Sequence, residues 1–284
     1  MIATLLPYPF DQNFMTRALV AALIVGTSAP LIGTFVVQRK LSLVGDGLGH
    51  VAAAGVGIAL WLGIAPQPVA IVATIVAACA IEWIFHASKS ADTALAVIFY
   101  SGIAASITFA GRSSRQSQLQ QFLFGSLLTA TWDDVLVIGC VCTVVSIIII
   151  ALWRLLLTIA IDESSAKIAG IPTHVLHVVL MCAVALIVSV SMTITGLLLI
   201  SAVMVVPVMT SRLFSRTFRS AWINSSLLGA LGSVVGLGTS RVLNIAPGGT
   251  IVLTHIAIFI LVGIVYSLIH RSSGRSKNNS HVHS

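Results

Sequence analysis

Charged residues are scarce in this sequence, and their scarcity excludes an ordinary soluble domain. Only 8% of the 284 residues are Asp, Glu, Lys or Arg, whereas 57% are hydrophobic. Soluble domains carry about a quarter charged residues, so most of the surface of this chain cannot face water. The composition therefore predicts an all-α fold: a polytopic membrane helical bundle.

Several sequence motifs of known chemistry are also missing. No G-x-x-x-x-G-K-[ST] phosphate loop is present, and no glycine is followed by lysine, so we expect that the chain does not hydrolyse ATP by itself. The metalloprotease motif H-E-x-x-H is absent as well, which argues against an intramembrane metalloenzyme. No charged n-region followed by a cleavage site opens the chain, so we expect no removable signal peptide.

Cysteines are few, and their positions indicate no disulfide framework. Each of the four lies in an apolar segment, where a small buried side chain is the ordinary role: Cys79, Cys140, Cys142 and Cys182. The net charge of +7 does not indicate nucleic acid as a partner, because the basic residues are scattered singly between the apolar segments. That distribution is typical of a membrane protein whose loop charges set its orientation.

Eight or nine segments are long and apolar enough to cross a bilayer, which takes about 20 residues. No linker divides them, so we expect a single domain over residues 1–284. The candidate spans are residues 14–38, 43–63, 66–86, 93–110, 133–157, 172–191, 193–211, 220–239 and 250–269. The seventh contains Pro207 and is a candidate for a broken or re-entrant segment. Residues 111–132 form a candidate re-entrant helix on the outer side.

The basic residues predict the orientation. With the N-terminus outside, eleven Lys and Arg residues fall on the inner side: Arg39, Lys40, Lys89, Arg154, Lys167, Arg212, Arg216, Arg219, Arg271, Arg275 and Lys277. Four fall on the outer side: Arg17, Arg112, Arg115 and Arg241. This bias follows the positive-inside rule, so we expect a cytoplasmic C-terminus. The polar tail from about residue 272 to 284 is expected to be disordered.

The second span carries two polar residues that a lipid-facing helix would not need. Asp46 and His50 are four residues apart, which places both side chains on one face of a helix. If the span begins near Leu41, His50 lies about 14 Å along the axis, close to mid-membrane. A charged group at that depth costs several kcal/mol and indicates a functional site.

A carboxylate and an imidazole together suit Zn²⁺, Mn²⁺ and Fe²⁺. Two ligands are too few for such an ion, so we expect two copies of the helix to face each other in a homodimer. Another interpretation stays open: with a helix start near Gly47, Asp46 would cap the helix and His50 would bond to a neighbouring helix. Gly45, Gly47 and Gly49 weaken the helix, which a close approach by another helix would explain.

The longest charged inner loop, residues 158–173, contains a short helix. Asp162 and Glu163 suit its first turn, Lys167 follows later, and Gly170 before Pro172 ends it.

Five stretches in order along the chain resemble the zinc/manganese class of ABC transporter permeases. They are GTFVVQRKLSLVGDGLGHVAAAGVGIAL (residues 33–60), KSADTALAVIFYSG (89–102), QFLFGSLL (121–128), TGLLLISAVMVVPVMTSRL (195–213) and PGGTIVL (247–253). The resemblance implies a homodimer in the prokaryotic cytoplasmic membrane. It also implies two partners: a cytoplasmic ABC ATPase subunit and an extracytoplasmic metal-binding protein.

The resemblance further implies roles for particular residues. Asp46 and His50 would contact the ion in transit, and no tightly bound cofactor is expected besides this transported metal. Residues 160–171 would be the coupling helix that docks into the ATPase, with Asp162, Glu163, Ala166, Lys167 and Gly170 as its candidate residues. Many relatives carry an aspartate where this chain has Asn244, so we assign no metal-binding role there.

The remaining polar residues allow more than one role. His255 is a candidate pathway residue, although a lone histidine on an apolar face usually makes a helix–helix hydrogen bond. Asp133 and Asp134 either attract cations at an acidic mouth or cap the fifth span. Glu82 and His86 are expected to extend toward the membrane interface, with an exit-side metal contact as the alternative, and His174 and His177 are expected to face the headgroups.

Two other transport functions stay open from the residues alone. An ABC permease for a siderophore, haem or corrinoid would need a wide and weakly charged path, which a buried Asp/His pair does not suit. A proton-coupled secondary transporter of metal could use the same pair as a proton relay.

Overall fold

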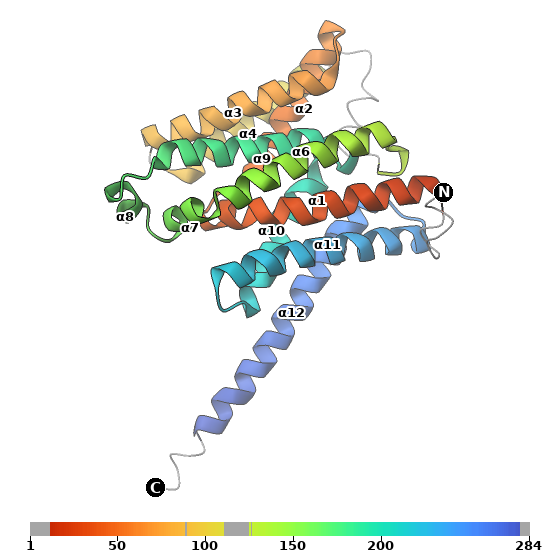
Figure 1. The fold of residues 1–284 in the computed structure, drawn as a ribbon. Helices are drawn as coiled ribbons and strands as arrows, with labels where there is room; N and C mark the ends of the chain where they lie inside the picture. Colours follow the sequence, from red (N-terminus) through yellow and green to blue (C-terminus); the bar gives the residue numbers. More distant parts are fainter. Residues whose placement is uncertain (1–11, 89, 111–124, 126, 279–284) are drawn as a thin grey trace.

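A computed structural model describes residues 12–88, 90–110, 125 and 127–278 of the chain. Within this part the protein is a bundle of α-helices without strands, as the composition predicts (Figure 1). Its elements are α1 (Asn13–Gln38), α2 (Val44–Leu62), α3 (Pro66–Ser88), α4 (Ala91–Ala110), the 3₁₀ turn η2 (Leu127–Thr129), α6 (Trp132–Ala151), α7 (Trp153–Ile161), α8 (Glu163–Ile168), α9 (Thr173–Thr195), α10 (Leu197–Phe214), α11 (Phe218–Leu243) and α12 (Pro247–Asn278).

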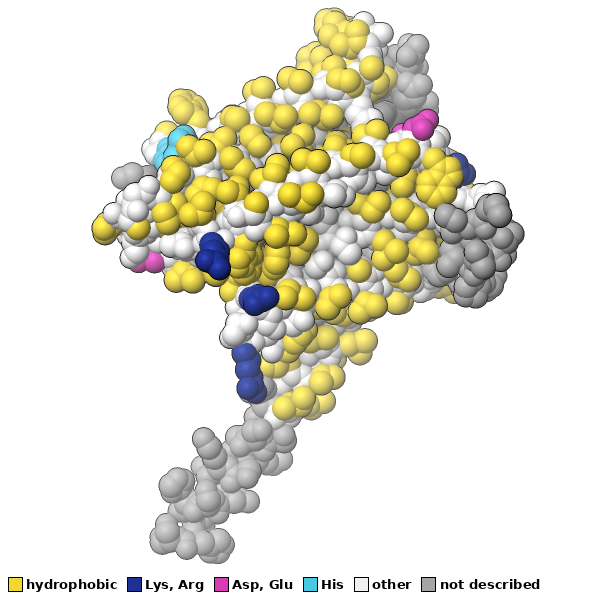
Figure 2. All heavy atoms as spheres, viewed as in Figure 1, with side chains coloured by type: hydrophobic (Ala, Val, Ile, Leu, Met, Phe, Trp, Pro, Cys, Tyr) yellow, Lys and Arg dark blue, Asp and Glu magenta, His cyan; other side chains and the backbone are white. Residues whose placement is uncertain are grey.

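Nine of the described helices are long and apolar enough to cross a membrane, which confirms the larger of the two predicted numbers. Most large apolar side chains on α6 and α12 are exposed, for example Ile147, Ile150, Leu261 and Leu268. Figure 2 shows hydrophobic side chains spread over this face of the bundle. Lipid covers such a surface, so the outer helices remain apolar all round.

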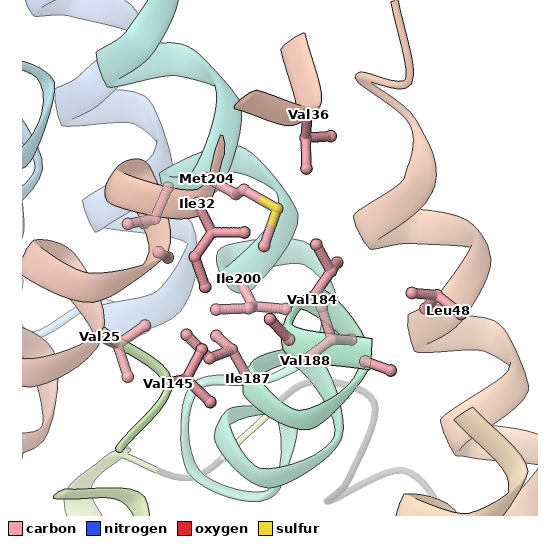
Figure 3. Close-up of a cluster of buried hydrophobic side chains, with 14 of the residues drawn as sticks. Val25, Ile32, Val36, Leu48, Val145, Val184, Ile187, Val188, Ile200 and Met204 are labelled. Carbon is pink, nitrogen blue, oxygen red and sulfur yellow. The ribbon is translucent and has the colours of Figure 1, made fainter. Parts of the chain in front are cut away.

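The core lies where α1, α2, α9 and α10 meet. α1 packs against α6, α10 and α11, and α2 packs against α3, α4 and α9. Val25 and Ile32 from α1, Leu48 from α2, and Val188 and Ile200 from α9 and α10 are all buried in one region (Figure 3). Close packing of these branched side chains holds α2 against the centre of the molecule.

Two sequence expectations about boundaries need correction. The fifth span ends at Ala151 rather than residue 157, and α7 follows as a separate helix whose Leu156 and Ile159 are buried. Pro207 lies inside α10 and does not break it. The break falls instead at Gly196, where φ is 79° and the backbone of Gly125 approaches so closely that a Cβ on Gly125 would lie 2.3 Å from Gly196 N.

The two ends of the bundle carry different elements. Figure 1 places α7, α8 and the connection between α10 and α11 at one end, opposite the N-terminal end of α1. The helical backbone of α12 continues to Asn278, past residue 272 where a disordered tail is expected, and residues 279–284 lie outside the described part. Most of the expected outer re-entrant segment, residues 111–132, lies outside it as well, as does Lys89.

Candidate functional site

Asp46 and His50 both lie within the regular part of α2. The helix begins at Val44, and its N-cap, Leu43, forms no capping hydrogen bond through a side chain. Asp46 is therefore in the first turn instead of at the cap, and the alternative helix start near Gly47 is wrong. At 1.5 Å per residue, His50 lies about 9 Å from the helix start, which is shallower than the sequence suggests.

Within the described part of the chain, no protein group forms a hydrogen bond with the side chain of Asp46 or of His50. Both side chains are only partly buried. The His50 ring packs edge-on against Phe99 of α4, with 5.1 Å between the ring centroids. A carboxylate and an imidazole on one helix face thus remain available to a ligand.

The glycines of α2 let two other helices approach this pair. A Cβ on Gly49 would lie 1.8 Å from Leu197 Cδ1 of α10, and a Cβ on Gly45 would lie 3.3 Å from Ser201 Oγ. On the side of α4, a Cβ on Gly102 would lie 2.9 Å from the backbone nitrogen of Val51. The close approach expected from the glycines is thus present at Gly45 and Gly49, but not at Gly47, where a Cβ would lie 4.0 Å from the nearest atoms of Phe99. The packing places Asp46 and His50 among α2, α4 and α10.

The other candidate ligands are not brought to this pair. His255 is 2% exposed and belongs to the contact between α11 and α12. Its Nδ1 donates to the carbonyl oxygen of Ile251 at 2.8 Å, and its ring fills the space beside Gly232. This Nδ1 hydrogen bond is made within its own helix.

Asp134 has a structural role at the start of α6. Its carboxylate accepts hydrogen bonds from the Thr131 backbone N–H at 3.0 Å and from the Thr131 hydroxyl at 2.6 Å. The Asp134 N–H donates in return to Thr131 Oγ1 at 3.2 Å, which completes a capping box. Asp133 is exposed beside it. Asn244, in turn, ends α11 as a left-handed residue with φ of 54°.

The expected short helix of the inner loop is α8, which is shorter than residues 160–171. Asp162 caps it by accepting from the Ser164 and Ser165 N–H groups at 2.9 and 3.3 Å. The Ser165 hydroxyl also donates to Asp162, and these bonds lower the pKa of the Asp162 carboxyl below its usual value. The Asp162 carboxylate therefore stays charged at neutral pH, and its negative charge stabilises the partly positive N-terminal end of α8.

The faces of α8 differ in burial. Ala166 is fully buried, whereas Ile168 is 88% exposed. Lys167 Nζ lies 2.7 Å from Glu163 Oε1 on the solvent side, and the hydrogen bond from Lys167 lowers the pKa of Glu163. Gly170, with φ of 77°, ends the segment as expected. α8 is thus anchored through Ala166 and presents an apolar residue and an ion pair at the end of the bundle.

A second polar cluster joins residues that the sequence analysis had considered only separately or in pairs. Glu82 on α3 is 1% exposed, and Arg39 donates to both of its carboxylate oxygens at 3.2 Å. His177 Nδ1 lies 3.4 Å and His86 Nε2 3.8 Å from Glu82 Oε1, while His86 Nε2 lies 2.9 Å from His174 Nδ1.

This cluster corrects two expectations. Glu82 does not extend toward the membrane interface, because the guanidinium of Arg39 reaches it inside the bundle. His177 is 2% exposed and does not face the headgroups, whereas His174 is exposed. The sequence carried one signal for the cluster: all five residues lie at span ends on the predicted inner side.

A hollow of about 640 Å³ lies at the other end of the bundle, between η2, the α9–α10 break and the start of α12. None of its described lining residues carries a carboxylate, an imidazole or a thiol. It therefore offers apolar volume at the end of the bundle opposite α8, but its described lining residues supply no metal ligands.

The sequence matches a family model. The model of the ABC 3 transport family matches residues 11–266. The manganese import system permease protein ScaB of Streptococcus parasanguinis is 33% identical over 251 residues, covering 88% of this chain and 89% of that protein. The high-affinity zinc uptake system membrane protein ZnuB of Haemophilus influenzae is 30% identical over 247 residues, covering 86% of this chain and 94% of that protein.

Solved structures share the fold. A chain of PsaBC from Streptococcus pneumoniae, solved in complex with Fab, superposes with a TM-score of 0.80 at 31% identity, covering 92% of this chain and 95% of that one. An inward-facing metal-chelate type ABC transporter superposes with a TM-score of 0.71 at 19% identity, covering 88% of this chain and 85% of that one. The second likeness concerns the fold alone.

Proposed function

The chain belongs to the ABC 3 transport family, and we propose that it is the permease through which an ATP-driven importer passes a divalent transition-metal ion, either zinc, manganese or iron. The family includes manganese and zinc permeases, and its members are subunits of a multi-pass membrane complex. This membership argues against the proton-coupled secondary transporter that the residues alone left open.

The observation that carries the proposal is the pair on α2. Asp46 and His50 share one face of α2, are only partly buried, and have no side-chain hydrogen bond to another part of the described chain. Placing an ionisable side chain within a membrane costs free energy, so such a residue indicates a functional site. A carboxylate oxygen together with an imidazole nitrogen suits a borderline divalent ion. A large organic cargo such as haem would gain little from this pair.

The remaining parts of the machine follow from the same proposal. A second copy of the chain supplies another Asp46 and His50, so that one ion has four protein ligands. A separate ATPase subunit docks on α8, and an extracytoplasmic binding protein delivers the metal. Exposed Ile168 and the anchored Ala166 support the docking role of α8. A force applied to its surface would pass into α7 and α9, which α8 contacts.

Substitution of the pair tests the proposal. We expect Asp46→Asn and His50→Ala each to abolish uptake of radioactive Mn²⁺ and Zn²⁺ by cells that depend on this importer, because each change removes an ion ligand. Asp92→Asn is the matched control: it removes an exposed carboxylate in the first turn of α4 and should leave uptake unchanged.

Membrane levels of each variant must equal those of the parent protein for the comparison to hold. Normal uptake by either Asp46→Asn or His50→Ala would remove the pair from the transport path. Competition among Zn²⁺, Mn²⁺ and Fe²⁺ in the same assay identifies which metal is carried.

A further inference from the structure

Three metal-binding side chains from α3 and α9 converge at the end of the bundle where α8 lies. The ligand atoms of Glu82, His86 and His174 all lie within 4.8 Å of one another. Zinc binds imidazole nitrogen at about 2.0–2.1 Å, so the ligands of a tetrahedral zinc site lie about 3.3 Å apart. The separations here, 2.9 Å between the two imidazoles and 3.8 Å between His86 and Glu82, lie on either side of that value.

We propose that Glu82, His86 and His174 form a second metal site, separate from Asp46 and His50, that reversibly binds a divalent transition-metal ion from the α8 side of the bundle. The site needs only this chain, and it does not depend on the proposed transport function.

The burial of the three side chains suits an ion that enters from the surface. Glu82 is buried, whereas the His86 side chain is 47% exposed and His174 is exposed. Both imidazoles line a hollow of about 500 Å³ together with Trp83 and Val178. Figure 2 shows histidine at the surface of this end of the molecule. Three protein ligands leave a fourth position for water, which is the pattern of an open zinc site.

The ligand set selects the class of ion. Two imidazole nitrogens and one carboxylate oxygen suit borderline ions such as Zn²⁺ and Co²⁺. They suit Mg²⁺ and Ca²⁺ poorly, since those ions prefer oxygen ligands throughout. Cys79 also lines the hollow, and its thiol is the kind of soft ligand that monovalent copper prefers. The three side chains that converge are a carboxylate and two imidazoles, which are harder ligands than a thiolate. Monovalent copper is therefore not the expected occupant.

The charge of Arg39 limits the affinity. Its guanidinium donates two hydrogen bonds to Glu82, and His177 also contacts that carboxylate. A carboxylate offers about four lone-pair positions, so Glu82 retains capacity for an ion. The nearby positive charge opposes a bound cation, and the site is therefore suited to exchange rather than to permanent occupancy.

A simpler interpretation is that His86 and His174 only bond to each other. In that case one imidazole N–H donates to the other ring, and the contact joins α3 to α9 without any ion. The two interpretations predict different behaviour toward added metal, so a binding measurement separates them.

The experiment uses the full-length protein in detergent at neutral pH. The starting protein for this titration, called the parent below, carries four substitutions. Asp46→Asn and His50→Ala remove the proposed transport ligands, and His281→Ala and His283→Ala remove the histidines of the C-terminal tail. The parent is titrated with Co²⁺, whose visible absorption reports a tetrahedral site, and bound Co²⁺ is then displaced with Zn²⁺. We expect one site per chain in this parent.

His86→Ala and His174→Ala are then introduced separately. Each should weaken Co²⁺ binding by about 100-fold or more, because loss of even a group that only orients a ligand costs up to that factor. His255→Gln, which removes a histidine from the α11–α12 contact, should bind as the parent does. Thermal unfolding without metal verifies that every variant is folded.

Absence of a cobalt band in the parent at micromolar metal would overturn the proposal. Parent-like binding by both His86→Ala and His174→Ala would overturn it equally. Since the parent lacks Asp46 and His50, a failure here leaves the proposed transport function untouched.

Discussion

At the scale of single residues, the two polar clusters differ in how far protein groups satisfy them. Asp46 and His50 lie partly exposed on α2 with no side-chain hydrogen bond to the described chain. Glu82 is buried, and Arg39 and His177 contact it. A buried charge requires partners, and Glu82 has them, so its burial by itself needs no transported ion.

Substitution of Glu82 should therefore lower stability. Glu82→Gln leaves the Arg39 guanidinium, whose side chain is 12% exposed, without its counter-charge. Breaking a buried pair from one side costs about 3–5 kcal/mol, and we expect a clear fall in the thermal unfolding temperature of the detergent-solubilised protein.

Glu163→Gln is the matched control for that measurement. It changes the other glutamate that pairs with a basic residue, Lys167, but this pair lies at the surface with side chains 40% and 57% exposed. Exposed pairs contribute less than about 1 kcal/mol, so the unfolding temperature should hardly change. Equal effects of the two substitutions would contradict the buried role of Glu82.

At the scale of elements, α8 is built by local rules that the sequence shows directly. Asp162 caps its first turn and Gly170 ends it. Ala166 is buried against the bundle, which only the packing of α8 beside α7 and α9 could reveal. Because a helix this short is only marginally stable by itself, the capping hydrogen bonds of Asp162 contribute much of its stability.

Removal of this cap should reduce transport. Asp162→Ala removes the acceptor for the Ser164 and Ser165 N–H groups, so α8 frays and transmits force poorly. We expect a several-fold fall in ATP-driven uptake with unchanged membrane levels. Asp162→Asn keeps a side-chain oxygen, because asparagine is also a strong N-cap residue, and it should retain most of the uptake. Full uptake by Asp162→Ala would argue against α8 as the coupling element.

At the scale of the whole molecule, the nine candidate spans of the described part place successive connections at alternate ends of the bundle. This arrangement agrees with the predicted separation of the basic residues between the two sides of the membrane. The end that carries α8 also carries Arg39, which follows α1, and Arg154 in α7. The link between α10 and α11, which contains Arg216, lies at the same end (Figure 1). This end is the expected cytoplasmic side.

Reporter fusions test this orientation. A reporter enzyme that is active only in the cytoplasm should be active when it is fused to the C-terminus, and a reporter that is active only outside should be inactive there. The reverse pattern would contradict the predicted orientation, and it would place α8 outside the cytoplasm, where an ATPase subunit could not bind it.

The proposed homodimer makes a prediction about metal content. If two copies of Asp46 and His50 share one ion, the purified dimer should retain one ion that is lost in Asp46→Asn. The count is made by elemental analysis on protein that carries His174→Ala, so that the second proposed site does not contribute. Two ions per dimer, both dependent on Asp46, would exclude a shared site.

The sequence by itself determined the elements that depend on composition and on neighbouring residues. Low charge and long apolar runs predicted the spans, and the Asp162, Glu163 and Gly170 pattern predicted α8. The spacing of Asp46 and His50 predicted their shared face. These features are local, because hydrophobicity, capping and the 3.6-residue period act within a few turns of one helix.

Only the tertiary structure decided which distant residues meet. It moved the break from Pro207 to Gly196, because the backbone of Gly125 packs there. It also joined Arg39, Glu82 and His177, which three separate helix ends contribute. Such contacts depend on how helices pack across the bundle, and no pattern within one helix specifies its partner.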